Sequence, residues 1–282
     1  GTFRLVSSCT LTDEMVLSGD LTIIGQTEDM NNLKTITAAT GKRHFKVNNA
    51  GHTLELWHVR ITSADITANS SPDNTGAIYI GTNGGTLNLY YSEILDNKVA
   101  SGGAIYAYGD SAANKNAIVN IYNSVIKDNE AEYYGGGIKI RFAVVTIEDT
   151  IIDNNEADQD GGALMAEDND LTITNSMISN NVGRKGGALN IQDGNTLIIR
   201  QSTFSSNDAT LAGGGEEIYI AGSPTITVVN TVGLDTGIVV KSGATPTYTT
   251  CTDSPCSEAP FTHACSAVDS NDVKQGVTCT AP

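Results

Sequence analysis

The sequence is short of positive charge and of long apolar runs. Its 282 residues include 16 Lys and Arg against 32 Asp and Glu, a formal net charge of −16. A nucleic-acid-binding protein needs a basic surface for the phosphates, so this class is excluded, and an anionic membrane surface is disfavoured for the same reason. No run approaches the roughly 20 apolar residues that span a bilayer, so we expect no membrane insertion.

Cysteine is scarce and unevenly placed. The 5 cysteines form no Cys-x-x-Cys pair, and His263 is the one histidine near the C-terminal group, which argues against a structural zinc site. Four cysteines in a short Ser/Thr/Pro-rich segment instead predict disulfides, and therefore an extracellular or cell-surface location, with one thiol left over. The candidates are Cys9 near the start and Cys251, Cys256, Cys265 and Cys279 within the last 32 residues.

Glycine is abundant, and much of it falls in a repeat. A motif of small residues, mostly Gly-Gly-Ala or Gly-Gly-Gly, begins at positions 75, 102, 135, 161, 186 and 213. A second motif, Ile-x-x-Asn or Phe-x-x-Asn, begins at positions 94, 126, 152, 178 and 204. Both series have a period of about 26 residues with one longer interval, which an insertion around residues 110–116 explains. A fixed period of this length indicates a solenoid.

Short strands occupy each repeat. Apolar residues alternate with polar ones before each asparagine motif, as at Leu87 and Leu89, and after each glycine motif, as at Ile105 and Ala107. This alternation is typical of half-buried strands, and no helical periodicity accompanies it. We therefore expect an all-β protein, a single-stranded parallel β-helix of about 26 residues per coil, with coils stacked at about 4.8 Å.

The repeats also divide the chain. Residues 1–70 lack the glycine motif but keep the strand rhythm, so we interpret them as opening coils, followed by repeats over 75–232. We predict one β-helix domain over 1–245 and a cysteine-bearing tail over 246–282.

One asparagine recurs in every repeat. In a parallel stack these residues form a column at a corner, where side-chain amides bond one another and the turn backbone. We interpret the column as an internal structural ladder rather than a binding row. Its members are Asn97, Asn129, Asn155, Asn181 and Asn207.

Tyrosines follow three of the glycine motifs on the outward side of the strand. Tyr79, Tyr106 and Tyr219 could stack on sugars or simply cover the strand surface, and the sequence favours the second interpretation.

The paired motifs carry a family resemblance. Repeated GGA(I/L) alternating with (F/I)xxN resembles the passenger repeats of polymorphic outer membrane proteins and related extracellular right-handed β-helix repeats. GGA occurs at residues 102, 161 and 186, FxxN begins at Phe204, and the similar region covers about residues 75–220. The resemblance implies a right-handed helix, surface display, adhesion and self-association.

An enzymatic alternative remains open. Right-handed β-helices also resemble pectate lyases and polygalacturonases, whose chemistry needs carboxylates gathered across adjacent coils. The nearest candidates are Asp96 stacked over Asp128, with Asp153 offset by one position. Exposed carboxylates in turns are usually only hydrated, so we predict no catalytic residue and no metal ligand set. The alternative is a secreted polysaccharide-binding or polysaccharide-cleaving enzyme.

The remaining expectations concern partners and modification. Asn69 begins a glycosylation sequon in a polar loop. We expect no cofactor, although the field of a −16 chain attracts divalent cations nonspecifically. Eight coils between Leu21 and Val240 would separate Cys9 from the tail, and the open ends of a β-helix favour head-to-tail stacking into a filament. We expect the partners to be further copies of the chain, surface glycans or cell-surface proteins.

Overall fold

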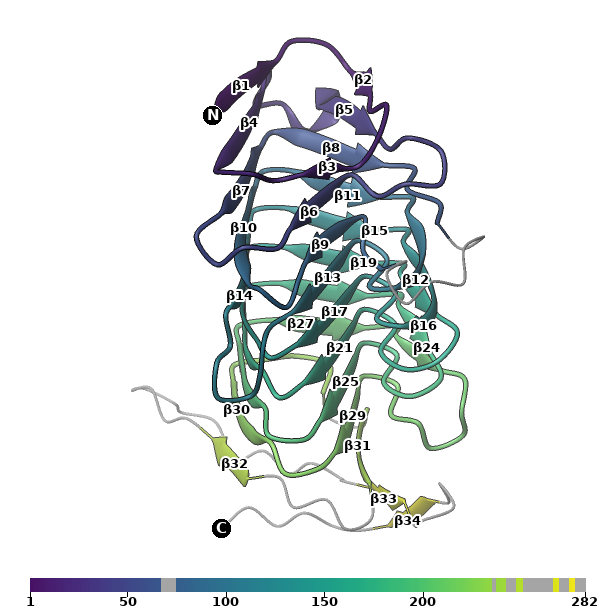
Figure 1. Ribbon diagram of the computed structural model, residues 1–282. Coiled ribbons are helices and arrows are strands. Elements are labelled where there is room, and N and C mark those ends of the chain that lie inside the picture. Colours follow the sequence, from purple (N-terminus) through teal and green to yellow (C-terminus); the bar gives the residue numbers. More distant parts are fainter. Residues whose placement is uncertain (67–74, 235–236, 242–246, 251–265, 269–273, 277–282) are drawn as a thin grey trace.

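The chain winds into a stack of coils in which each strand pairs with the equivalent strands of the coils before and after it (Figure 1). The computed structural model describes residues 1–66, 75–234, 237–241, 247–250, 266–268 and 274–276. Strand pairing within these ranges is parallel, apart from β33 with β34. The predicted parallel β-helix is confirmed.

Four sheets run along the stack, and we number these faces in the order in which a coil visits them. Face 1 comprises β1 (Thr2–Leu5), β4 (Leu21–Gly25), β7 (Thr53–Trp57), β10 (Gly85–Tyr90), β14 (Ala117–Tyr122), β18 (Ala143–Glu148), β22 (Asp170–Thr174), β26 (Thr196–Arg200), β30 (Thr225–Val229) and β32 (Thr247–Thr250). Face 2 comprises β2 (Cys9–Thr10), β5 (Lys34–Thr37), β8 (Val59–Thr62), β11 (Glu93–Leu95), β15 (Val125–Lys127), β19 (Ile151–Asp153), β23 (Met177–Ser179) and β27 (Thr203–Ser205).

The other two faces complete each coil. Face 3 comprises β12 (Lys98–Ser101), β16 (Glu130–Tyr134), β20 (Glu156–Ala157), β24 (Val182–Gly183) and β28 (Asp208–Ala209). Face 4 comprises β3 (Met15–Val16), β6 (Phe45–Val47), β9 (Ile78–Ile80), β13 (Ile105–Tyr108), β17 (Ile138–Arg141), β21 (Leu164–Glu167), β25 (Leu189–Gln192), β29 (Ile218–Ala221), β31 (Ile238–Lys241), β33 (Ser266–Val268) and β34 (Lys274–Gly276). A 3₁₀ turn, η1 (Met30–Asn32), lies between β4 and β5.

The core is a stack of aliphatic layers. On face 1, Leu87 pairs with Leu54 in the preceding coil and with Val119 in the following one, and all three are 0% exposed. Outward residues of the same strand, such as Asn88, are only half-buried. Because each coil covers the apolar residues of its neighbours, stacking buries a continuous core that no single coil could form.

The coil count matches the sequence prediction. From β4 to β31 the chain makes eight coils, and β1–β3 form part of a further coil at the N-terminal end. Beyond residue 245, β32 pairs with β30 and β33 pairs with β31. Faces 1 and 4 therefore extend into the segment that we interpreted as a tail.

One glycine motif begins later than the sequence alignment placed it. Leu189 pairs with Ile218, so Gly215 rather than Gly213 occupies the place of Gly186. Both glycines have positive φ, 66° at Gly186 and 73° at Gly215. The alignment at residue 213 is wrong because the connection from face 3 to face 4 is longer in this coil.

Candidate functional site

The five asparagines lie in one buried column at the corner between faces 2 and 3. The side-chain amides of the first four donate to Oδ1 of the asparagine in the next coil, at 2.9 Å for Asn97 to Asn129, 2.9 Å for Asn129 to Asn155, 3.0 Å for Asn155 to Asn181 and 2.9 Å for Asn181 to Asn207. The backbone N–H of Asn155 also donates to Oδ1 of Asn181, at 2.9 Å. None of the five is more than 5% exposed, so the column cannot serve as an outward binding row.

Glu217 ends this column and was not identified from the sequence. The Asn207 amide donates to Oε2 of Glu217 at 2.6 Å. Glu217 stands at the position that Ala188 occupies one coil earlier and is 8% exposed. Burial raises the pKa of Glu217 to about 7, although the hydrogen bond from Asn207 opposes the shift. A carboxylate where other repeats have Ala or Gly was the available sequence signal.

Two further ladders were also missed. At the corner between faces 1 and 2, the backbone N–H of a serine in one coil donates to the side-chain hydroxyl of the equivalent serine in the next. Ser92 donates to Ser124 at 3.2 Å, and Ser176 donates to Ser202 at 3.2 Å. Between faces 4 and 1, the N–H of Asn169 donates to Oδ1 of Asn195 at 2.8 Å. The turns of the described repeats are thus held by inward polar side chains.

Face 4 carries a row of cations and aromatic rings on its outward side. Lys46, Tyr79, Tyr106 and Lys139 occupy one register position in four successive coils, and we call these four residues the face-4 strip. The rings of Tyr79 and Tyr106 stack at 5.8 Å between centroids. The ammonium groups lie over the outer ring faces, Lys46 at 5.6 Å from Tyr79 and Lys139 at 5.6 Å from Tyr106.

Two arginines lie beside the strip. Arg43 is over the Tyr79 ring at 4.9 Å, and its Nε pairs with Glu14 at 2.6 Å. Arg141 is over the Tyr108 ring at 5.5 Å, and its Nε lies 3.4 Å from Glu167. Each arginine therefore has a carboxylate of its own. The two lie on opposite sides of the strip, Arg43 before β6 and Arg141 at the end of β17.

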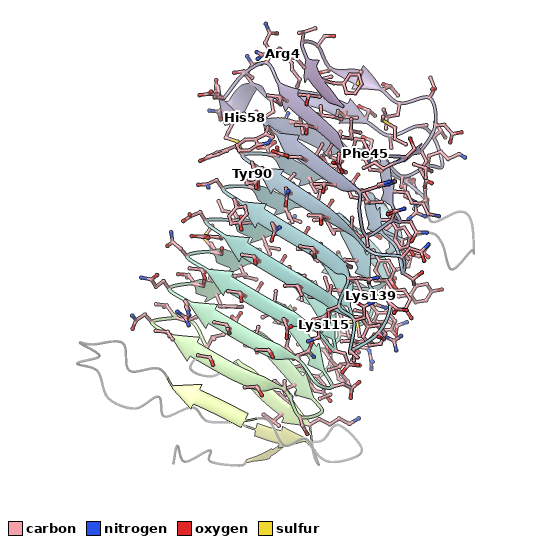
Figure 2. All side chains as sticks on the ribbon, turned by 60° about the vertical axis from the view of Figure 1, so that its left-hand side comes forward. Arg4, Phe45, His58, Tyr90, Lys115 and Lys139 are labelled. Carbon is pink, nitrogen blue, oxygen red and sulfur yellow. The ribbon has the colours of Figure 1, made fainter. Side chains whose placement is uncertain are left out.

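The strip lysines differ from these arginines. Among the described residues, neither Lys46 nor Lys139 has an ion-pair partner. Burial lowers the pKa of Lys139, against the opposing effect of the Glu167 charge. The pKa of Tyr106 is raised, mainly by burial. In Figure 2, Lys139 lies on the opposite side of the molecule from Tyr90 and His58.

The outward side of face 4 is closed in the C-terminal coils. The register position of the strip continues through Met165, Asn190 and Tyr219, and none of these is more than 2% exposed. Lys185, in the connection that precedes β25, lies over the Tyr219 ring at 5.0 Å. Tyr219 is thus inaccessible to a sugar. Among the described residues of this row, the open side chains lie in the N-terminal half of the stack, at the exposed Val16 and the four half-open residues of the strip.

A neutral aromatic row lies on face 1. Trp57, Tyr90 and Tyr122 stack in successive coils, with centroids 4.0 and 5.4 Å apart. Burial raises the pKa of Tyr90, and the charge of Glu55 adds to the shift. The rings cover one another's faces, which fits a structural covering of the strands.

The carboxylates considered for catalysis sit in the turn between faces 2 and 3. Asp96 and Asp128 have left-handed φ values of 54° and 55°. Asp128 accepts from Asn154 at 2.7 Å and pairs with Lys127 at 3.0 Å. Burial acts to raise the pKa of Asp128, but these hydrogen bonds and the Lys127 charge outweigh it, so the pKa lies below its usual value. A general acid needs the opposite shift.

Asp153 is offset from this pair as the sequence predicted. It pairs in register with Lys127 and accepts from Ser179 at 2.7 Å and from Asn180 at 2.8 Å. Within the described ranges, no group of three or more His, Cys, Asp or Glu side chains could hold a metal ion.

The remaining candidates are mostly outside the described residues. Cys9 lies on β2 and is exposed and free. The other candidates lie outside the described ranges: Asn69, Cys251, Cys256, Cys265 and Cys279. No helix in the described part of the chain is long and apolar enough to cross a membrane.

Comparison with known proteins defines the family. A family model described as a right-handed β-helix region matches residues 103–273, more than half of the chain. The chain therefore belongs to the right-handed β-helix family. No curated protein and no solved structure matches it.

Proposed function

We propose that the chain is an extracellular, non-enzymatic β-helix with a structural or adhesive role, of the kind that polymorphic outer membrane protein repeats suggest. The observation that carries the proposal is the face-4 strip, an outward row of half-open charged and aromatic side chains on a scaffold held by buried ladders. Adhesion needs side chains that reach a ligand from a rigid support. The predicted disulfides and sequon are the support for an extracellular location.

Adhesion can be measured directly. The full chain, coated on beads, should retain cells or surface glycans, and free protein in solution should compete for the binding. Beads coated with a protein in which Tyr79 and Tyr106 are both alanine should bind less than beads coated with a Tyr122→Ala control, whose ring lies on face 1. Equal binding by both variants would place the adhesive surface elsewhere.

The enzymatic alternative predicts that the protein releases fragments from a polysaccharide. Incubation with a panel of acidic and neutral polysaccharides should release no fragments, as judged by chromatography and by absorbance of unsaturated ends. Fragment release that Asp96→Asn or Asp128→Asn abolishes would overturn the non-enzymatic proposal.

Self-association is the second part of the proposal, and the N-terminal end of the stack favours it. A cavity of about 140 Å³ opens there between Phe3, Leu11, Met15 and Phe45. Phe3 is 62% exposed, and within the described residues β1 pairs with β4 alone. A second copy whose last coil continues faces 1 and 4 would pair with this edge and cover the apolar residues.

Light scattering and negative-stain imaging test this stacking. The unmodified chain should form end-to-end assemblies that a Phe3→Lys, Met15→Lys double variant disperses. A reductant or Cys9→Ser should disperse them only if a disulfide holds the junction. Monomers at all concentrations would contradict the stacking.

A further inference from the structure

The cations of face 4 are unusual for so acidic a chain. The protein has 32 acidic residues and 16 basic ones, so a lysine on its surface readily meets a carboxylate. Lys98, for example, lies 2.5 Å from Glu130, and Lys115 lies 2.7 Å from Asp170. Lys46 and Lys139 instead lie over tyrosine rings, and no described residue forms an ion pair with either ammonium group.

The ammonium group of Lys139 is held between aromatic rings, where it loses part of its hydration. Its ammonium group is only partly exposed and lies between two rings, 5.6 Å from Tyr106 and 4.4 Å from Tyr134. A largely desolvated charge without a direct ion pair is unfavourable. The cation–π contacts and the more distant Glu167 charge offset only part of the lost hydration. An anionic group bound from outside would supply the missing counter-ion.

The spacing of the strip describes the shape of that ligand. Lys46 and Lys139 are three coils apart, about 14 Å along the axis at the usual strand separation. A ligand that pairs with both must be extended and must carry negative groups at intervals along its length. The row of polar and aromatic residues is bounded by Val16 in the coil before Lys46 and by the buried Met165 in the coil after Lys139. The contact with a ligand therefore covers about four coils.

The chemistry of the face also argues against a peptide ligand. The backbone groups of β9, β13 and β17 are already engaged in parallel pairing, so a peptide could not add as a further strand. The rings of Tyr79 and Tyr106 cover each other, and the lysines cover their outer faces, so the ring faces are not available to a ligand. A ligand would contact the ammonium groups and the polar edges of the rings. These groups suit a chain that bears both hydroxyls and anions.

We propose that the face-4 strip binds an extended acidic polysaccharide whose carboxylate or sulfate groups pair with Lys46 and Lys139. The inference rests on the proposed adhesive function, because it names the ligand of the same surface. Arg43 and Arg141 lie on either side of the strip, and each is paired with a carboxylate, so the proposed ion pairs rest on the two lysines.

Binding to defined polymers tests the proposal. The full chain should bind immobilised heparin, which carries sulfates, or polygalacturonate, which carries carboxylates, and the preference between them identifies the anion. Affinity should fall as salt rises, because ion pairs carry it. Uncharged dextran should not bind. Equal binding to dextran, or tighter binding to poly-glutamate than to both polysaccharides, would overturn the assignment.

A matched pair of double variants locates the site. Lys46→Gln with Lys139→Gln should weaken binding at least tenfold. Lys98→Gln with Lys127→Gln removes the same charge from faces 3 and 2 and should change affinity less than twofold. Circular dichroism melts confirm folding of both. Equal losses in the two variants would show nonspecific attraction and contradict the proposal.

Lysine labelling provides a measurement that needs no variant. Bound heparin or polygalacturonate should protect Lys46 and Lys139 from acetylation, read by mass spectrometry, while Lys98 stays reactive. Absence of protection with a polymer that binds would overturn the site. If neither polymer binds while the beads still retain cells, this inference fails and the adhesive function stands. Cleavage of either polymer would instead overturn the non-enzymatic proposal.

Discussion

The inner asparagine column and the face-4 strip are both rows of equivalent positions, one residue per coil, yet they are built on opposite rules. The column repeats one residue five times, each amide bonding the next at 2.9–3.0 Å. The strip places lysine, tyrosine, tyrosine and lysine at a single register position. The uniform inward row marks what the fold requires, whereas outward positions at the same spacing are free to differ from coil to coil.

The physical reason lies in the geometry of stacking. An inward polar residue is closed in by the coils on both sides, so the only partners available are the backbone and the same position in the next coil. An outward residue faces solvent and can change without breaking the stack. Removing inward and outward groups should therefore have very different consequences.

The largest difference should appear between neighbours on one strand, β17. Ile140 points inward and is 0% exposed, whereas Lys139 points outward. Ile140→Ala should lower the free energy of unfolding by about 2–5 kcal/mol, because it leaves a cavity between tightly stacked layers. Lys139→Gln should change it by less than about 1 kcal/mol. Urea denaturation measures both, and similar values for the two would contradict the inward–outward distinction.

The next effect concerns the end of the column. Burial raises the pKa of Glu217 to about 7 from 4.5, so the folded state binds this proton more tightly than the unfolded state. Its contribution to stability is present below pH 4.5 and is lost as pH rises through about 7, a change of about 2–3 kcal/mol. Glu217→Gln should remove this loss, measured as the difference in free energy of unfolding from the unmodified chain between pH 4.5 and 8. The exposed neighbour variant Glu216→Gln should keep most of it, because the Glu216 charge contributes less to the raised pKa than burial does.

A smaller effect is expected within the column. Asn155→Ala should lower the free energy of unfolding by about 1–3 kcal/mol, because the N–H of Asn129 and the carbonyl of Ile126 lose their buried partner. Asn83, which is exposed, provides the control. Thermal melts that place Asn155→Ala level with Asn83→Ala would mean that the amide ladder contributes nothing.

The sequence predicted the column well and the strip poorly, for the same physical reason. Identical residues at a fixed period, such as Asn129 and Asn155, indicate that the equivalent positions share one environment. The strip combines Lys46 with Tyr79 and Lys139, three residue types whose alignment appears only when the register of each coil is known. The outward tyrosines were noted, but their lysine neighbours were not.

Register also explains the two local errors of interpretation. The connection before β29 is longer than its predecessors, and counting glycines from Gly213 therefore missed the true equivalent, Gly215. The same shift hid Glu217 at an inward position, because its place beside Asn207 follows from that corrected alignment.

The insertion at residues 110–116 has a bearing on how such molecules change over generations. It loops out between β13 and β14 and leaves the pairing of Ala117 with Gly85 and Ala143 intact, while Lys115 reaches Asp170 two coils further on. Extra residues can therefore be added at a bend without altering the strand register of any face. By the same logic, recombination that duplicated or removed one whole coil would change the length of the rod by a single strand spacing and carry the outward pattern along in frame.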